Sequence, residues 1–561
     1  MLSAFQASGP SEKNYSCELP SAVVDPSVVM PNASWGDATD SVEWQTGIMS
    51  SVLGLPPELL IEIFTLYSKD PDVGPGLSIT PLGGVSTPVI SLSHICSSWR
   101  EVVISTPHLW TWITVDLGYV SRGTQRALEL VQLYIRRSSN ARLTLGIQAL
   151  RQGSGANSDR EVYIEEFSEI GWEIFQLFLY EHSRWYEVSL KLRWTLFDQA
   201  SEVLVGLLPA MDGKYNFPQL EVLKIGWESS YWPRRSTNWF IDQFKDNVPV
   251  LHTLSLPYFS PSFPFPFSQL TCVNLFDDDS WISAPAMLKS CSIIHKLELA
   301  CGPERIWTTA NIVITSTSLK SLTILMKDFV PAYETLSTLT LPSLVSLHLM
   351  TPDPGLSGFA LARSTSSDWK RTFWFKNFIA FIERSGCQLE TFIIDGNIFL
   401  EDHLLRLFAL TTNVKHLSIR TLSWYEPILT NGLFRALTLH HSATDVELLS
   451  ISSEVQNKRT NLLPNLTSLE MYFSDLDSIL SYRLVSPENI FSMIESRTKL
   501  PFDSNEDALA RLTSLDVFDF RADFDTEKGK EWAGKFRSDV EPRLREFESL
   551  GMFKMNVKLN I

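Results

Sequence analysis

Hydrophobic positions beyond about residue 180 follow one recurring string, apolar-x-x-apolar-x-apolar. Its last two apolar positions stand two residues apart, the spacing of side chains that point to one face of a β-strand. Neighbouring copies most often start 25 residues apart, as from Ile294 to Leu319 and from Leu319 to Leu344. The eleven copies begin at Leu220, Leu251, Leu270, Ile294, Leu319, Leu344, Leu389, Val414, Val446, Leu466 and Leu512, and Trp185 begins a degenerate earlier copy.

The segments between these strings carry helical signals. Residues 373–385 have apolar side chains at helical spacing and stop at Gly386, a residue type that commonly ends helices. Proline stands two residues before four of the strings, where it terminates the preceding helix. Each unit thus supplies one strand and one outer connection, and neither can bury its apolar side alone, so the units must stack. The sequence predicts an α/β solenoid with one long parallel sheet over residues 216–561, preceded by a linking region with degenerate first repeats at 116–215.

A different pattern occupies residues 51–115. Prolines at 56 and 57 suit the first turn of a helix, and Leu59, Ile63 and Phe64 share one face of it. A Pro- and Gly-rich stretch at 70–88 predicts a loop, and a second helix is expected from Val89 to just before Pro107. So few helical residues cannot bury so many large apolar groups among themselves. Either a partner protein covers part of their surface, or these helices cap the domain that follows.

The order of landmarks in this region resembles an F-box, particularly the form common in fungal proteins. The landmarks are Leu55-Pro56-x-Glu58-Leu59-Leu60-x-x-Ile63-Phe64, then Ile95-Cys96-x-x-Trp99-Arg100, then Pro107-x-Leu109-Trp110. The chain departs from that pattern by the insertion at 70–88. The repeats in turn resemble the irregular leucine-rich-repeat half of F-box proteins, although the Asn or Cys that usually follows the last leucine is mostly missing.

This resemblance implies a non-catalytic substrate-recognition subunit of an SCF-type cullin ubiquitin ligase. Its F-box would bind the Skp adaptor, and through it a cullin, while its repeats hold a protein target. The residues expected to contact the adaptor, or to support that contact directly, are Leu55, Pro56, Leu59, Ile63, Ile95, Trp99, Leu109 and Trp110. The alternative is a leucine-rich-repeat scaffold for protein–protein interaction that belongs to no ligase.

Candidate target-binding residues come from two places. An aromatic-rich loop combines tryptophan with arginine, residue types that are over-represented at binding hot spots, and the outward strand positions of the repeats supply the others. The set is Trp227, Trp232, Arg234, Lys296, Glu298, His348, His416, Arg420 and Tyr472. Tryptophans that cap the core, and a strand face that is merely solvated, would give the same pattern.

Composition and charge indicate which partners and which compartment to expect. The chain has 47 Lys and Arg against 64 Asp and Glu, a formal charge of −17, and no basic patch, so nucleic acid is not an expected partner. Its six cysteines are scattered, which suits a reducing compartment. Residues 1–50, acidic and rich in Ser and Pro, predict a disordered tail. Without a signal segment or an apolar run of ~18 residues, we expect an intracellular protein, cytoplasmic and/or nuclear, with no membrane partner.

No residue constellation suggests catalysis or a cofactor. Asp277, Asp278 and Asp279 are adjacent, which favours an acidic turn over a cation site with ligands at defined offsets. Cys291, His295 and Cys301 lack the fourth ligand and the close pairing typical of zinc sites. The sequence therefore predicts a binding protein without an active site, metal or cofactor.

Overall fold

The computed structural model describes the following residues: 55–69, 76–80, 84–118, 125–152, 161–163, 167–193, 195–197, 199, 215–226, 239–276, 284–301, 313–327, 329–351, 367–396, 398–422, 430–439, 462–475, 486–498, 517–524, 527–549 and 554–560. The chain divides into two compact units, Met1–Leu60 and Ile61–Ile561. The predicted tail at 1–50 lies outside the described residues. Of the first unit, only the chain from Leu55 to Leu60 is described, and it contains the start of helix α2 (Pro57–Lys69).

The second unit is an α/β structure built on one long sheet. Sixteen strands form this sheet, and all neighbouring pairs are parallel except β1 with β2. In spatial order the strands are β2 (Val85–Ser86), β1 (Leu77–Ile79), β3 (Trp112–Asp116), β4 (Leu143–Gln148), β7 (Trp185–Lys191), β8 (Val222–Gly226), β9 (Thr253–Leu256), β10 (Cys272–Leu275), β11 (Lys296–Cys301), β13 (Ser321–Met326), β15 (Ser346–Met350), β16 (Thr391–Asp395), β17 (His416–Leu422), β18 (Ser468–Asp475), β19 (Val517–Phe524) and β20 (Lys554–Asn560). Two short pairs, β12 (Ile314–Thr315) with β14 (Leu339–Thr340) and β5 (Leu150–Gln152) with β6 (Glu161–Tyr163), stand apart.

The recurring string sets the register of this sheet. Leu297 pairs with Leu322, which pairs with Leu347, and the second inward positions pair in the same way. Both inward positions of the first eight copies and of the tenth are almost fully buried. The degenerate copy also belongs to the series, since Val188 pairs with Leu223. The strand prediction is therefore confirmed for these copies, because the period of two keeps each pair of apolar side chains on one face.

The last copy was predicted in the wrong register. Phe518 pairs with Leu469 and Phe520 with Met471, so the string that begins at Leu512 lies three residues too early. The copy at Val446 lies outside the described residues, and β17 pairs directly with β18. At its other end the sheet includes β3 and β4, where Ile113 pairs with Leu145. The parallel sheet thus begins well before residue 216.

The stretch at 70–88 is not simply a loop. Leu77 and Ile79 are buried in β1, which pairs with β3 on one side and with β2 on the other. Gly76 has φ +44°, and a Cβ there would overlap the main-chain oxygen of Trp112. Only glycine combines that backbone conformation with so close an approach. The insertion therefore provides a short hairpin at the edge of the sheet.

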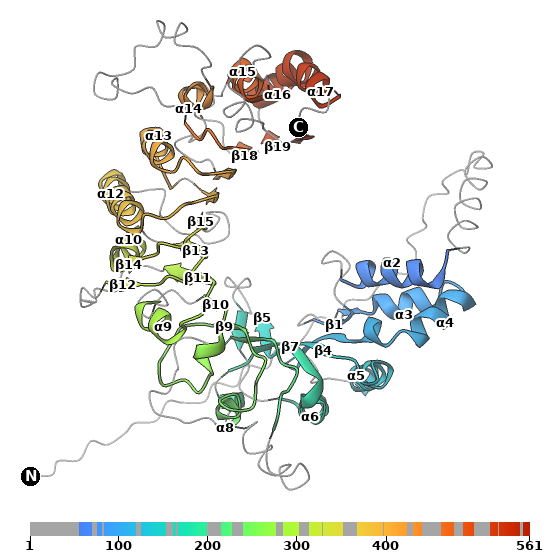
Figure 1. Ribbon diagram of the computed structural model, residues 1–561. Coiled ribbons are helices and arrows are strands. Elements are labelled where there is room, and N and C mark those ends of the chain that lie inside the picture. Colours follow the sequence, from blue (N-terminus) through green and yellow to red (C-terminus); the bar gives the residue numbers. More distant parts are fainter. Residues whose placement is uncertain are drawn as a thin grey trace, which may run out of the picture. The chain divides into compact units, whose positions relative to one another are not determined.

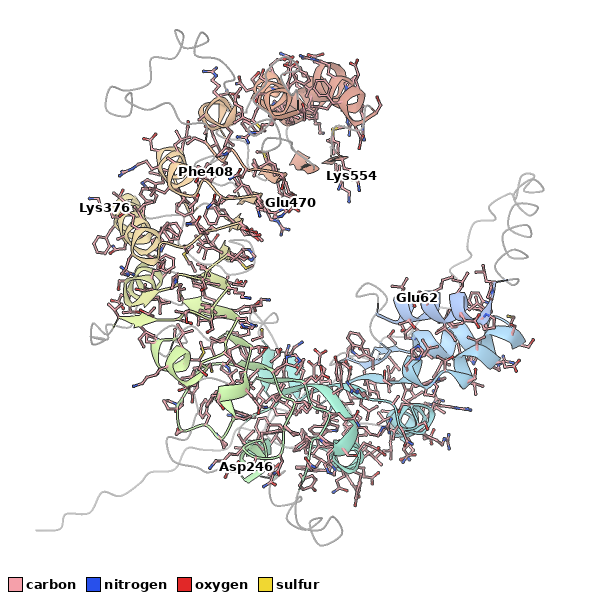
Figure 2. The ribbon with its side chains drawn as sticks, in the orientation of Figure 1. Glu62, Asp246, Lys376, Phe408, Glu470 and Lys554 are labelled. Atoms are coloured by element: carbon pink, nitrogen blue, oxygen red, sulfur yellow. The ribbon has the colours of Figure 1, made fainter. Side chains whose placement is uncertain are left out.

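Helices connect the strands. They are α2, α3 (Pro88–Ser93), α4 (Ser97–Ser105), η1 (Pro107–Trp110), α5 (Gln125–Arg137), α6 (Glu169–Tyr180), η2 (His182–Arg184), α8 (Trp239–Asp242), η5 (Phe267–Gln269), α9 (Ala284–Ser290), α10 (Phe329–Thr338), α12 (Ser367–Ser385), α13 (Glu401–Leu410), α14 (Asn431–Leu437), α15 (Pro487–Thr498), α16 (Glu527–Lys535), η10 (Phe536–Val540) and α17 (Glu541–Ser549). Helices α12 and α13 lie on the same side of strands β15–β17 (Figure 1). Lys376 and Phe408 belong to these helices, whereas Glu470 lies on strand β18 (Figure 2). As predicted, Gly386 ends α12, with φ +57° and its N–H donating to Ile382 O.

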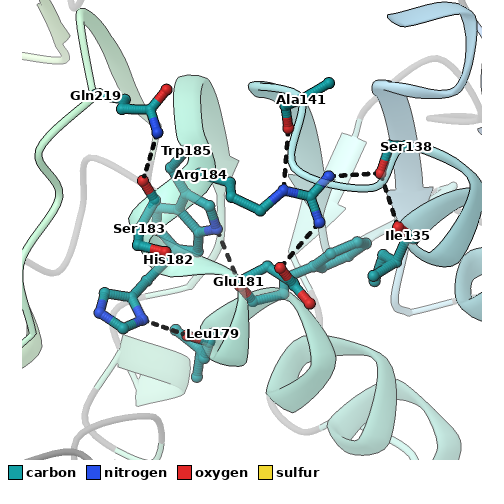
Figure 3. Close-up of polar contacts among 11 residues, drawn as sticks. Ile135, Ser138, Ala141, Leu179, Glu181, His182, Ser183, Arg184, Trp185 and Gln219 are labelled. Atoms are coloured by element: carbon teal, nitrogen blue, oxygen red, sulfur yellow. Dashed lines mark hydrogen bonds and ion pairs between the residues drawn. The ribbon is translucent and has the colours of Figure 1, made fainter. Parts of the chain in front are cut away.

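Arginine side chains link successive connections between the strands. Arg184 donates from Nε to the oxygen of Ala141, from Nη1 to Glu181 and from Nη2 to Ser138 (Figure 3). Arg384, at the end of α12, donates to the oxygens of Leu336 and Leu339 near the end of α10. Carbonyl groups at a helix C-terminus lack partners within the helix and attract cations. The arginine of one connection thus donates hydrogen bonds to main-chain oxygens near the helix end of the preceding connection.

Arg497 makes the most extensive contacts of this kind. It is 1% exposed and donates to the oxygens of Leu437, Leu462 and Leu463. Burial lowers the pKa of its guanidinium to about 10, which leaves it charged at neutral pH. Leu437 is the last residue of α14, and Arg497 lies in the last turn of α15. One side chain therefore joins two helix ends and the turn that precedes β18.

Candidate protein-binding surfaces

Helix α2 carries apolar side chains on two faces. Leu60 and Phe64 are buried, whereas Leu59, Ile63 and Leu66 are 52%, 45% and 64% exposed. The exposed three are spaced i, i+4 and i+7, so they follow one stripe along the helix. The exposed stripe is thus the face of the helix that is most open to solvent.

The second predicted helix is broken into two. Helix α3 ends at Ser93, and Cys96 begins α4 as its N-cap, with its Sγ accepting the N–H of Trp99. Ile95, which lies in the break, is 47% exposed, and Ile104 of α4 is also exposed. The prediction of one continuous helix was wrong here, because a capping side chain satisfies the backbone at Trp99 and starts a new helix.

The predicted adaptor residues separate into two groups. Pro56, Leu59, Ile63 and Ile95 are exposed, and Leu55 is half-buried. Leu109 and Trp110, in contrast, are almost completely buried, so they can support a partner surface but cannot contact a partner directly. Exposed Leu66 and Ile104 were missed, although the spacing of Leu66 from Leu59 and Ile63 was visible in the sequence.

Trp99, another predicted adaptor residue, packs helix α2 against helix α4. Its half-buried ring lies 4.8 Å from that of Phe64, which fixes the second half of α2 against α4. A further contact joins α2 to η1, where the Thr65 hydroxyl lies 3.2 Å from Nε2 of His108. These contacts pack the second half of α2 against α4 and η1.

The second candidate surface is the strand face opposite the core. Because the strands are parallel and in register, equivalent outward positions line up in rows across neighbouring strands. One row contains Glu298, Thr323 and His348, and another contains Asp395, Arg420 and Tyr472. Lys296 and His416 belong to a third row, which is otherwise rich in serine and threonine. The structure thus places six of the predicted target-binding residues on one face of the sheet.

Charged residues on this face are largely paired. Lys296 Nζ lies 2.8 Å from Glu298 Oε1, and its hydrogen bond to Glu298 raises the pKa of Lys296. Arg420 Nη1 lies 3.7 Å from Asp395 Oδ2. Burial lowers the pKa of His348, so its imidazole is neutral at pH 7. This part of the face therefore offers hydroxyl groups and balanced charge. The predicted Trp227, Trp232 and Arg234 lie outside the described residues.

Burial makes two of the described cysteines weakly acidic. Burial raises the pKa of Cys291 to about 12 and that of Cys387 to about 11, so both are thiols at neutral pH. In the described ranges no three His, Cys, Asp or Glu side chains gather closely enough to hold a metal ion. Asp277, Asp278 and Asp279 lie outside those ranges.

Comparisons with known proteins give no assignment. No protein-family model matches the chain, and no curated protein matches it. Among the described helices, none combines the length and the apolar composition required to cross a membrane.

Proposed function

We propose that this chain is the substrate-recognition subunit of an SCF-type cullin ubiquitin ligase. In this proposal the exposed side chains of α2, α3 and α4 bind the Skp adaptor, and the strand face of a leucine-rich-repeat-like solenoid binds a protein target. The supporting observation is the exposed stripe Leu59, Ile63 and Leu66, since large apolar side chains at the surface are typical of partner contacts. The order of F-box landmarks in the sequence is the reason for proposing the Skp adaptor as this partner.

The strand face suits a protein target better than a metabolite. Neighbouring strands lie ~4.8 Å apart, so the sixteen strands present a surface much longer than a small-molecule pocket. Its rows of hydroxyl, amide and charged groups suit an extended chain or a folded surface. The protein would perform no bond chemistry. It would raise the concentration of its target near a ubiquitin-loaded enzyme and restrict the target's orientation.

A second candidate is a repeat scaffold in which the helices are only a cap. The observation that favours it is the burial of Trp110, whose ring lies 4.9 Å from Tyr134 of α5. The helices thus share buried side chains with α5, the first connection of the sheet, as a cap would. The scaffold would bind proteins through the strand face without a ligase partner.

Capture of the purified Skp adaptor by the full chain distinguishes the two functions. Combined Leu59→Asp and Ile63→Asp should abolish capture while leaving thermal unfolding nearly unchanged, because both side chains are exposed. The matched control combines Val250→Asp and Ile293→Asp, two similarly exposed apolar residues elsewhere, and should capture normally. No capture by the folded wild-type chain would leave the scaffold as the better account. Point variants are required, because removing residues 51–115 would also remove strands β1, β2 and β3.

A further inference from the structure

The outward face of β3, β4 and β7 contains a hollow centred on Gly146. In the row across these strands, Gly146 lies between Thr114 and Ser189. Equivalent positions farther along the sheet hold larger side chains, such as Glu298 and His348. Without a side chain at Gly146 the face is recessed there, and the hollow has a volume of about 240 Å³.

The packing around Gly146 explains why the hollow stays open. A Cβ at this position would lie 2.8 Å from Oγ1 and 3.0 Å from Cγ2 of Thr114, closer than ordinary contact. Trp112 stands on one side of the hollow and Lys191 on the opposite side. The spacing of strands makes three of them about 10 Å wide, which is enough for one side chain. The hollow therefore fits a single residue of a bound polypeptide.

The accessible charge around the hollow is positive. Lys191 is exposed, and Lys224 on the next strand lines the hollow with its Nζ 2.6 Å from Oε1 of Glu187. Asp116, also on this face, is fully buried and accepts the N–H of Gly118. Two ammonium groups and one accessible carboxylate thus line the hollow, although the whole chain has a formal charge of −17. An anionic side chain would find here an exposed ammonium group, that of Lys191.

We propose that this hollow receives an anionic side chain, a carboxylate or a phosphate, from an extended segment of the target protein. Lys191 supplies the main charge contact, the hydroxyls of Thr114 and Ser189 supply hydrogen bonds, and Trp112 packs against the segment. This inference rests on the proposed function, because it assigns the strand face to target recognition. It adds the chemical class of the residue that the target presents.

Binding of the full chain to immobilised random peptides tests the inference. The peptides carry glutamate, phosphoserine or glutamine at a fixed centre. The wild-type chain should retain glutamate- or phosphoserine-centred peptides about tenfold more than glutamine-centred ones, since a charge-assisted hydrogen bond is worth about that factor. Comparison of the two anionic sets shows whether a carboxylate or a phosphate is preferred. Equal retention of all three sets would overturn the proposal.

Two variants test whether the preference for anionic peptides arises at the hollow. Lys191→Glu should remove the preference for anions and favour lysine-centred peptides, while Ser189→Phe should fill the hollow and reduce retention of every set. Lys320→Glu makes the same charge change at an exposed residue before β13 and should behave as wild type. Equal effects of Lys191→Glu and Lys320→Glu would contradict the proposal. Adaptor capture by the same preparations tests the ligase function separately, since Lys191 lies on the strand face and not on the helices.

Discussion

The indole Nε1 of Trp110 donates a 2.8 Å hydrogen bond to the main-chain oxygen of Val103. Val103 lies in α4, and Trp110 ends η1, two residues before β3 begins. The same indole ring contacts Tyr134 of α5. One side chain therefore joins α4 and η1 to α5, the first connection of the sheet, so these three elements share a core.

Trp110→Ala should lower the free energy of unfolding by about 3–5 kcal/mol, because it removes a buried aromatic ring and leaves a cavity. Trp110→Phe retains most of the ring and should cost much less, chiefly the hydrogen bond to Val103. Denaturant titration measures both. Equal stability of Trp110→Ala and the wild type would show that the two regions fold without this contact.

Two glycines with positive φ should respond differently to alanine. Gly386→Ala should cost only the strain of the left-handed backbone, about 1 kcal/mol, since nothing lies within 4 Å of the new Cβ. Gly76→Ala adds overlap with the main chain of Trp112, so it should cost more and should also disturb the hairpin of β1 and β2. Thermal unfolding of the two variants checks the order, and a smaller effect at Gly76 would contradict the close approach.

Arg497→Met should destabilise the chain by about 3 kcal/mol or more, because it leaves buried carbonyl oxygens of Leu437, Leu462 and Leu463 without their donor. Arg126→Met, an exposed change in α5, serves as the control and should have little effect. Midpoints of denaturant unfolding give the comparison. Similar midpoints for the two variants would mean that the helix ends do not depend on Arg497.

Stability should fall between pH 7 and pH 5 in part because of His182. Burial lowers the pKa of this residue, whose ring packs against Tyr215 and Phe217. Below pH 6.5 the unfolded chain therefore binds a proton more readily than the folded chain does, so protonation favours unfolding. His182→Gln should show a weaker loss of stability over this range when the free energy of unfolding is measured against pH. An unchanged pH dependence would exclude His182 as a cause.

The strands were largely predictable because their inward positions repeat with period two. At β19 the prediction failed because two overlapping sets of residues fit the apolar pattern. Around β19 the string that begins at Leu512 has the required apolar residues, but pairing selects Phe518 and Phe520 three residues later. Strand β20 was missed because Met555 and Val557 did not resemble the leucine-rich copies. The β1 hairpin was missed because glycine and proline around it indicated only a loop.

The division between core and partner surface could not be predicted. Leu59 and Leu60 are adjacent and chemically identical, yet Leu59 is exposed and Leu60 is buried. Ile63 and Phe64 are adjacent and both apolar, yet Ile63 is exposed and Phe64 is buried. A short helix with apolar residues on both faces gives no sequence signal for which face packs inward. The hollow at Gly146 was also missed, because its shape depends on side chains from several strands that are far apart in the chain.

The proposed binding of the Skp adaptor by the exposed apolar stripe on α2 is tested most directly by calorimetric titration of the purified adaptor into the full chain. The wild type should bind with measurable affinity, Ile63→Asp with Leu66→Asp should not bind, and Val250→Asp with Ile293→Asp should bind like the wild type. Unfolding temperatures should stay close together in all three proteins. Binding that survives in the α2 variant, or its absence in the folded wild type, would contradict the account.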